Sequence, residues 1–123
     1  MEKKILIISR DIFFHKLLKK LMEKNIKNCE LFIYKSKREI DRISQDSKID
    51  FVVLDGEFNS LSAFEVLRIL RVEKRIIAPI WFFSDIDRKD YIYKAYAIGA
   101  SKIIKKTFDP IEIVNDIANI LNK

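Results

Sequence analysis

Three side chains that could together handle a phosphoryl group each close a short apolar run of this chain. They are the carboxylate of Asp55, the hydroxyl of Ser84 and the ammonium of Lys106. A carboxylate can attack a phosphoryl donor as a nucleophile. A hydroxyl can hydrogen-bond phosphoryl oxygens and an ammonium can pair with them. Whether these groups meet depends on the elements that carry them.

Apolar runs and helical segments alternate along the chain. The runs predict strands at residues 5–8, 31–34, 50–55, 80–84 and 103–106. Apolar residues at helical spacing predict helices at residues 14–22, 38–45, 63–70, 92–99 and 110–121. Unbroken apolar strands, each followed by a helix, predict a parallel sheet that is covered on both faces.

Sites in such sheets form outside the carboxyl ends of the strands, where the strand order reverses. The residues that the pattern gathers at this edge are Ser9, Arg10, Asp11, Asp55, Ser84 and Lys106. The sequence therefore predicts that the three candidate side chains converge there.

The composition is that of a globular domain, with 49% hydrophobic and 34% charged residues among 123, and we expect one domain over residues 1–123. No apolar run reaches the roughly 18 residues of a membrane span. The apolar run after Met1 is too short for a signal peptide. Cys29 is alone, which excludes a disulfide within the chain. We expect a cytoplasmic protein without membrane contact.

The net charge is +6, and part of it forms a stripe at helical spacing. The lysines of this stripe are Lys16, Lys20, Lys24 and Lys27. Such a stripe could attract nucleic acid or an acidic protein surface. No aromatic residues interleave with the lysines for base stacking, which favours a solvated helix face over nucleic-acid binding.

Two stretches of the chain resemble the response-regulator receiver family. They are Asp50 to Arg71, with Asp-Phe-Val-Val-Leu-Asp at its start, and Ala97 to Pro110, with Ile-Gly-Ala and Lys-Thr-Phe-Asp-Pro. The resemblance implies an α/β, flavodoxin-like (βα)5 fold, doubly wound, with a five-stranded parallel sheet of order 2-1-3-4-5. It places Asp55 at the phosphoacceptor position, and Ser84 and Lys106 at phosphoryl-contact positions.

The chain departs from this family where a metal site should form. Ser9 and Arg10 stand where the family has two acidic residues that hold Mg²⁺, and Ile103 stands at its aromatic switch position. We expect Arg10 to pair with the Asp55 carboxylate and to exclude the metal. The hypothesis that follows is a pseudo-receiver. This is a receiver fold, not an enzyme and without a cofactor, that works by protein contact without Mg²⁺-dependent phosphorylation.

Two other functions stay open. Asp11 and Glu57 could join Asp55 in a substitute oxygen site for Mg²⁺, and a histidine kinase would then phosphorylate Asp55. The chain could also be an unrelated flavodoxin-like binding domain. Residues 9–12 lack a Ser/Thr/Gly-rich phosphate loop, which disfavours flavin.

The expected partners are proteins, either a histidine kinase or a downstream regulator. A homodimer would use the face of the fourth and fifth helices, which offers Tyr91, Tyr93, Lys94, Lys102 and Lys105. His15, beside Lys19, is expected to be solvated. Whether an output domain follows Lys123 is not decided by these residues.

Overall fold

A five-stranded parallel sheet organises the chain, and the computed structural model describes residues 2–57 and 62–122. The strands are β1 (Lys3–Ile8), β2 (Cys29–Tyr34), β3 (Phe51–Asp55), β4 (Ile80–Phe83) and β5 (Lys102–Ile104). They pair in the order β2-β1-β3-β4-β5, and every pairing is parallel. The predicted fold class and strand order are confirmed.

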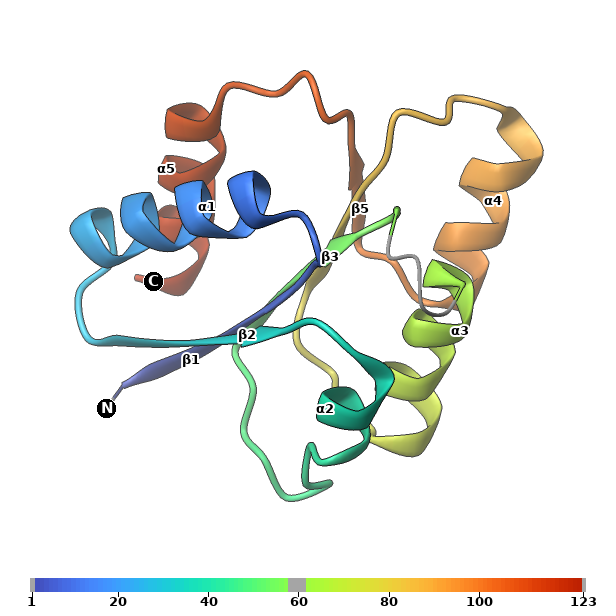
Figure 1. Ribbon diagram of the computed structural model, residues 1–123, viewed down its shortest axis with the longest axis horizontal. Coiled ribbons are helices and arrows are strands. Elements are labelled where there is room, and N and C mark those ends of the chain that lie inside the picture. The colour runs from blue at the N-terminus through green and yellow to red at the C-terminus, as the bar shows by residue number, and fades with distance from the viewer. Residues whose placement is uncertain (1, 58–61, 123) are drawn as a thin grey trace.

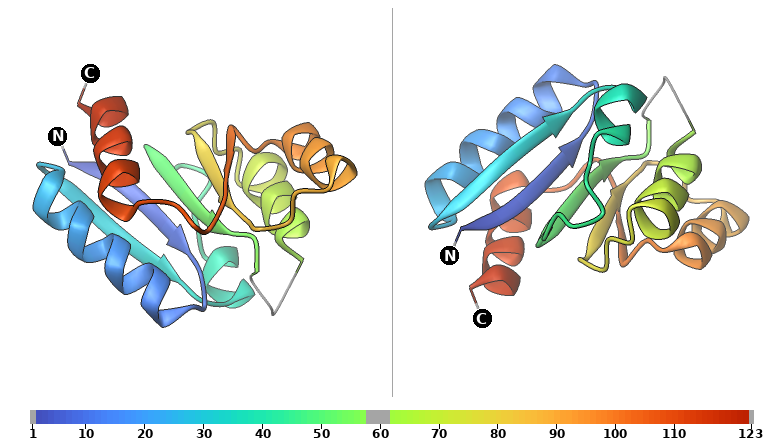
Figure 2. Two further views of the ribbon diagram at one scale, coloured as in Figure 1. Left: turned by 90° about the horizontal axis from the view of Figure 1, so that it is seen from above. Right: turned by 90° about the horizontal axis from the view of Figure 1, so that it is seen from below.

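Helices cover both faces of the sheet (Figure 1). They are α1 (Ile12–Asn25), α2 (Lys37–Asp41), α3 (Ala63–Arg68), a π-helix η1 (Ile69–Glu73), α4 (Lys89–Ile98) and α5 (Pro110–Leu121). The two views of Figure 2 place α1 and α5 on one face and α2, α3 and α4 on the other. No described helix is both long and apolar enough to cross a bilayer.

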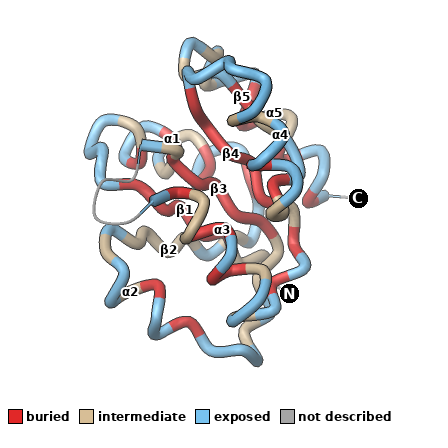
Figure 3. Tube along the Cα trace, turned by 90° about the vertical axis from the view of Figure 1, so that its right-hand side faces the viewer, coloured by how far each residue is buried: buried red, intermediate tan, exposed pale blue. Residues whose placement is uncertain are grey.

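Each face of the sheet has its own core, because successive strand residues point to opposite sides. In β1, Ile5 and Ile7 pack with α1 and α5, whereas Leu6 and Ile8 pack with the helices opposite. All four side chains are fully buried, and Figure 3 shows the central strands β3 and β4 as buried along their length. The unbroken apolar strands of the sequence follow from this two-sided burial.

Several predicted element ends differ from the observed ones. The predicted strands 80–84 and 103–106 end at Phe83 and Ile104, so Ser84 and Lys106 lie just beyond the sheet. The helix predicted at residues 38–45 is observed as the shorter α2, which ends at Asp41. The third helix continues through η1, where the Lys74 N–H donates to the Ile69 carbonyl, five residues earlier.

His15 was expected to be solvated, and this expectation is wrong. Its side chain is 2% exposed, and neither ring nitrogen has a hydrogen-bond partner among the described residues. Burial lowers the pKa of the imidazole, and the positive charges of Lys35 and Lys16 lower it further. His15 is therefore a buried, neutral residue of the helix–sheet contact.

Candidate functional site

The Asp55 carboxylate is the centre of a hydrogen-bond cluster at the carboxyl edge of the sheet. It closes β3 and is 2% exposed. One oxygen, Oδ1, lies 2.7 Å from the Lys106 Nζ and accepts the Glu57 backbone N–H at 2.9 Å. The other, Oδ2, accepts the Ser9 hydroxyl at 2.7 Å. Three donors therefore engage the carboxylate, and each of its two oxygens accepts at least one of them.

Lys106 is held in place from both its backbone and its side chain. Its backbone N–H donates to Asp85 Oδ1 at 2.8 Å, which fixes the loop after β5. The Nζ also lies 3.3 Å from Glu57 Oε2 and 5.4 Å from the centroid of the Phe14 ring. The side chain is only 14% exposed, so the pair with Asp55 is shielded from water.

The pKa of Lys106 results from opposing effects. Burial acts to lower the pKa of the ammonium, because it penalises the charged form. The hydrogen bond and charge of Asp55, with those of Glu57, outweigh burial and hold the pKa above its usual value. Lys106 is therefore a protonated partner of Asp55 at neutral pH.

Ser9 is the residue that completes the cluster from β1. It is fully buried, and its backbone N–H extends the sheet by donating to the Tyr34 carbonyl at 3.1 Å. Its hydroxyl oxygen accepts the Asp11 N–H at 3.0 Å while its proton goes to Asp55. The Ser9 hydroxyl is thus fixed as a donor to the carboxylate.

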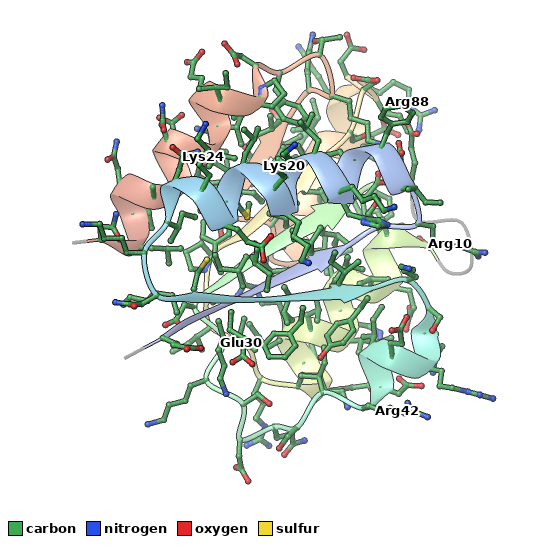
Figure 4. All side chains as sticks on the ribbon, turned by 60° about the vertical axis from the view of Figure 1, so that its left-hand side comes forward. Arg10, Lys20, Lys24, Glu30, Arg42 and Arg88 are labelled. Carbon is green, nitrogen blue, oxygen red and sulfur yellow. The ribbon has the colours of Figure 1, made fainter. Side chains whose placement is uncertain are left out.

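Arg10 does not form the pair with Asp55 that we expected from the sequence. It is exposed, its side chain points away from the sheet (Figure 4), and no ion pair joins it to Asp55. Ser9 points into the site, and its neighbour Arg10 points out, as alternation along an extended chain requires. Lys106 is the cation that faces Asp55.

Ser84 and Ile103 lie at the same edge but outside the hydrogen bonds of Asp55. Ser84 is 1% exposed, and its hydroxyl oxygen accepts the Ile86 N–H at 3.1 Å. The Ile103 side chain is half-buried against the core of α2, α3 and α4. Its backbone N–H donates to the Tyr96 hydroxyl at 3.3 Å. Neither residue contacts the carboxylate through a hydrogen bond among the described residues.

The residues around Asp55 do not fit Mg²⁺, which requires several oxygen ligands in near-octahedral geometry. Asp11 Oδ1 caps α1 by accepting the Phe14 N–H at 3.2 Å, and Glu57 faces Lys106. Over residues 2–57 and 62–122, no cluster of acidic, histidine or cysteine side chains could hold a metal ion. The substitute site of Asp11, Asp55 and Glu57 is not assembled.

Aromatic side chains form a wall behind Lys106 that the sequence analysis missed. The Phe83 ring stands edge-on to Phe14 and Phe108, with centroids 5.3 and 5.1 Å apart. Trp81, Phe82 and Phe83 are core residues, as predicted. The signal for the wall was Phe14 near the start of α1 and Phe108 two residues after Lys106.

Comparison with known proteins gives the family. The model of the response regulator receiver domain matches residues 5–118 of the chain. The chain belongs to this family. The receiver is 31% identical over 87 residues to the response regulator SaeR of Staphylococcus aureus strain USA300. That match covers 71% of this chain and 37% of SaeR, so the chain spans little more than a third of its curated relatives.

Solved structures show the same fold at low identity. A response regulator from Thermotoga maritima superposes with a TM-score of 0.79 at 20% identity, over 100% of both chains. A CheY-like receiver domain protein from Methanospirillum hungatei JF-1 gives 0.83 at 17% identity, over 99% of this chain and 95% of that one. These structures show that the receiver has a flavodoxin-like fold.

Proposed function

We propose that this receiver is a pseudo-receiver, which signals through protein contacts without Mg²⁺-dependent phosphorylation of Asp55. The observation that carries the proposal is that protein donors engage both oxygens of the Asp55 carboxylate. Ser9 donates to one oxygen, and Lys106 and the Glu57 N–H engage the other. Each of these contacts stabilises the resting carboxylate and so lowers its reactivity as a nucleophile toward a phosphoryl donor.

Ser9 and Arg10 also support the proposal, because neither residue offers a carboxylate to a metal ion. A serine hydroxyl that donates its proton to Asp55 supplies no negative charge, and Arg10 is exposed. Phosphoryl transfer depends on cations that neutralise charge on the moving group. Without a carboxylate at these positions, Lys106 is the cation left for this task among the residues that the structure describes.

A phospho-accepting receiver is the second candidate, and one observation favours it. The Lys106 Nζ, 2.7 Å from Asp55 Oδ1, is placed where it could also pair with a phosphoryl oxygen on that carboxylate. Ser84 stands at the same edge with its hydroxyl proton uncommitted among the described hydrogen bonds. Under this alternative, a histidine kinase phosphorylates Asp55 with Mg²⁺.

Intact-protein mass spectrometry after incubation with Mg²⁺ and acetyl phosphate separates the two. The pseudo-receiver stays unmodified, whereas a stoichiometric phosphoryl adduct refutes the proposal. The matched control is Asp55→Asn, because an adduct that persists in this variant lies on another residue. A family member with an intact acidic pair, treated in parallel, shows that the reagent is active.

The proposed partners are proteins with acidic surfaces, such as a histidine kinase or a downstream regulator. The first half of α1 exposes Phe13 (89%) and Ile12 (59%) beside Lys16 and Lys20. Exposed apolar side chains among lysines suit a protein surface that carries both apolar and acidic groups. A cytoplasmic location remains a prediction.

A homodimer through the face of α4, β5 and α5 is also proposed, with one correction. Tyr93 is 70% exposed, and Lys94, Lys102 and Lys105 are exposed as well. Tyr91 is not part of this surface, because its ring packs against Phe64 and Phe82. Sedimentation velocity at high concentration tests the dimer, and a monomer throughout contradicts it.

A further inference from the structure

Arg71 binds several loops together at the end of the sheet opposite to Asp55. Its Nε and Nη2 both donate to the Gly99 carbonyl, at 2.9 and 2.8 Å. Its Nη1 donates to the carbonyls of Ile76 and Ala78, at 2.9 and 2.7 Å. Nη2 also donates to the Ser101 hydroxyl at 3.2 Å. One guanidinium therefore joins η1, the η1–β4 loop and the α4–β5 turn.

The charge of Arg71 is compensated by carbonyl groups rather than by a carboxylate. Among the described ion pairs, none includes Arg71, whereas its neighbour Arg68 is exposed and pairs with Glu65 and Glu73. Burial lowers the pKa of the Arg71 guanidinium. A half-buried cation held by neutral acceptors, three backbone carbonyls and the Ser101 hydroxyl, depends on all of these hydrogen bonds, so its position is tightly determined.

Gly99 is shaped to receive this arginine. It ends α4 with a φ of 141°, a conformation that side-chain-bearing residues rarely adopt. An added Cβ would also lie 2.6 Å from Arg71 Cγ, so the arginine stem lies directly on the glycine. Two residues later, Ser101 exchanges hydrogen bonds with Ile80, at 2.8 and 3.0 Å. The turn is thus fixed to Arg71 and to the start of β4.

We propose that Arg71 is a conformational clasp, which holds the α4–β5 turn against the η1–β4 loop and so fixes α4 in one position. The clasp acts without any contribution from Asp55, since all its contacts lie at the amino end of β4 and β5. It rests on the proposed function in one respect: a receiver that works without phosphorylation needs its α4–β5 surface held in a constant arrangement.

Hydrogen exchange by NMR on Arg71→Met tests the clasp. The N–H groups of Gly99, Ala100 and Ser101 should exchange roughly 10-fold faster or more, while those of β1 and β3 keep their protection once the change in global stability is subtracted. The melting temperature should fall by roughly 5–15 °C. The matched control is Arg68→Met, on the same helical segment, which should leave the turn unchanged. Unchanged exchange in the turn, or an equal increase throughout the sheet, overturns the proposal.

If Arg71→Met does not fold, a second variant still tests the clasp. Arg71→Lys keeps the charge but cannot reach the acceptors as a planar fork, so the turn should still lose protection. Gly99→Ala should displace the Arg71 stem, and its effect should be less than additive with that of Arg71→Lys. Additive effects contradict a shared clasp. Phosphorylation of wild-type Asp55 would refute the pseudo-receiver but leave these exchange results standing.

Discussion

The pair of Asp55 and Lys106 should show a strong energetic coupling. Their charged atoms are 2.7 Å apart, and the side chains are 2% and 14% exposed. Unit charges at that distance attract by about 6 kcal/mol at an effective dielectric constant of about 20. Measured couplings between contacting residues are smaller than this Coulomb figure, because water and neighbouring side chains rearrange in each variant, and we expect a coupling of about 2 kcal/mol.

A double-mutant cycle measures this coupling. Lys106→Met leaves a buried carboxylate without its cation and should lower the free energy of unfolding by about 3 kcal/mol. Asp55→Asn keeps the shape and should cost less. The double variant, with neither charge buried, should be more stable than the sum of the two losses by about 2 kcal/mol.

Urea unfolding, followed by the fluorescence of Trp81, is a suitable assay, because Trp81 is the only tryptophan and is 4% exposed. A difference of 2 kcal/mol corresponds to a midpoint shift of about 1 M. The control is Lys105→Met, at an exposed neighbouring lysine, which should change stability by less than about 0.5 kcal/mol. A coupling below about 0.5 kcal/mol would refute the shielded pair.

Three further changes test other parts of the account. Ser9→Asp combined with Arg10→Asp restores the acidic pair and should bind Mg²⁺ roughly 10-fold or more tightly than the wild type by calorimetry; equal binding contradicts the role given to these positions. The pKa of His15 is lowered in the folded state from its usual 6.5, so the unfolded state binds more protons as the pH falls. The free energy of unfolding should therefore be unaffected by His15 above pH 6.5 and should decrease as the pH falls below it. His15→Leu should remove this loss of stability at acidic pH. Urea midpoints that vary with pH as in the wild type speak against it. Gly56→Ala would place a Cβ 2.8 Å from the Phe83 carbonyl oxygen and should destabilise the fold by about 1–3 kcal/mol in thermal unfolding; a wild-type melting temperature means that the Asp55 loop is less closely packed than described.

The fold could be predicted because the strands carry a strong and simple signal. Runs such as Ile5 to Ile8 are apolar at every position, which fits burial on both faces of a parallel sheet. The resemblance to the receiver family then supplied the strand order. Together they bring Asp55 and Lys106 to one edge, where the structure joins them.

The donors around Asp55 could not be chosen from residue types alone. An arginine was the stronger candidate for a carboxylate partner, yet the serine beside it points inward. Side chains alternate along an extended chain, so continuing the pattern of β1 places Ser9 and Arg10 on opposite sides. This geometry, rather than charge, decides which of the two side chains reaches Asp55. A hydroxyl carries no sequence signal for the group to which it donates.

His15 shows how a helix face can be misassigned by one position. Apolar spacing over the predicted helix 14–22 includes Leu17, which is 44% exposed. The residues that are buried are His15, Leu18 and Met22, a stripe rotated toward the sheet. Hydrophobicity placed the stripe, but the packing angle of the helix on the sheet decided which residues it covers.

The most direct test is a crystal structure of the protein with Mg²⁺ and beryllofluoride. We predict an Asp55 carboxylate that still accepts the Ser9 hydroxyl and pairs with Lys106, with neither ion bound. Beryllofluoride on Asp55 beside a coordinated Mg²⁺ would contradict the account.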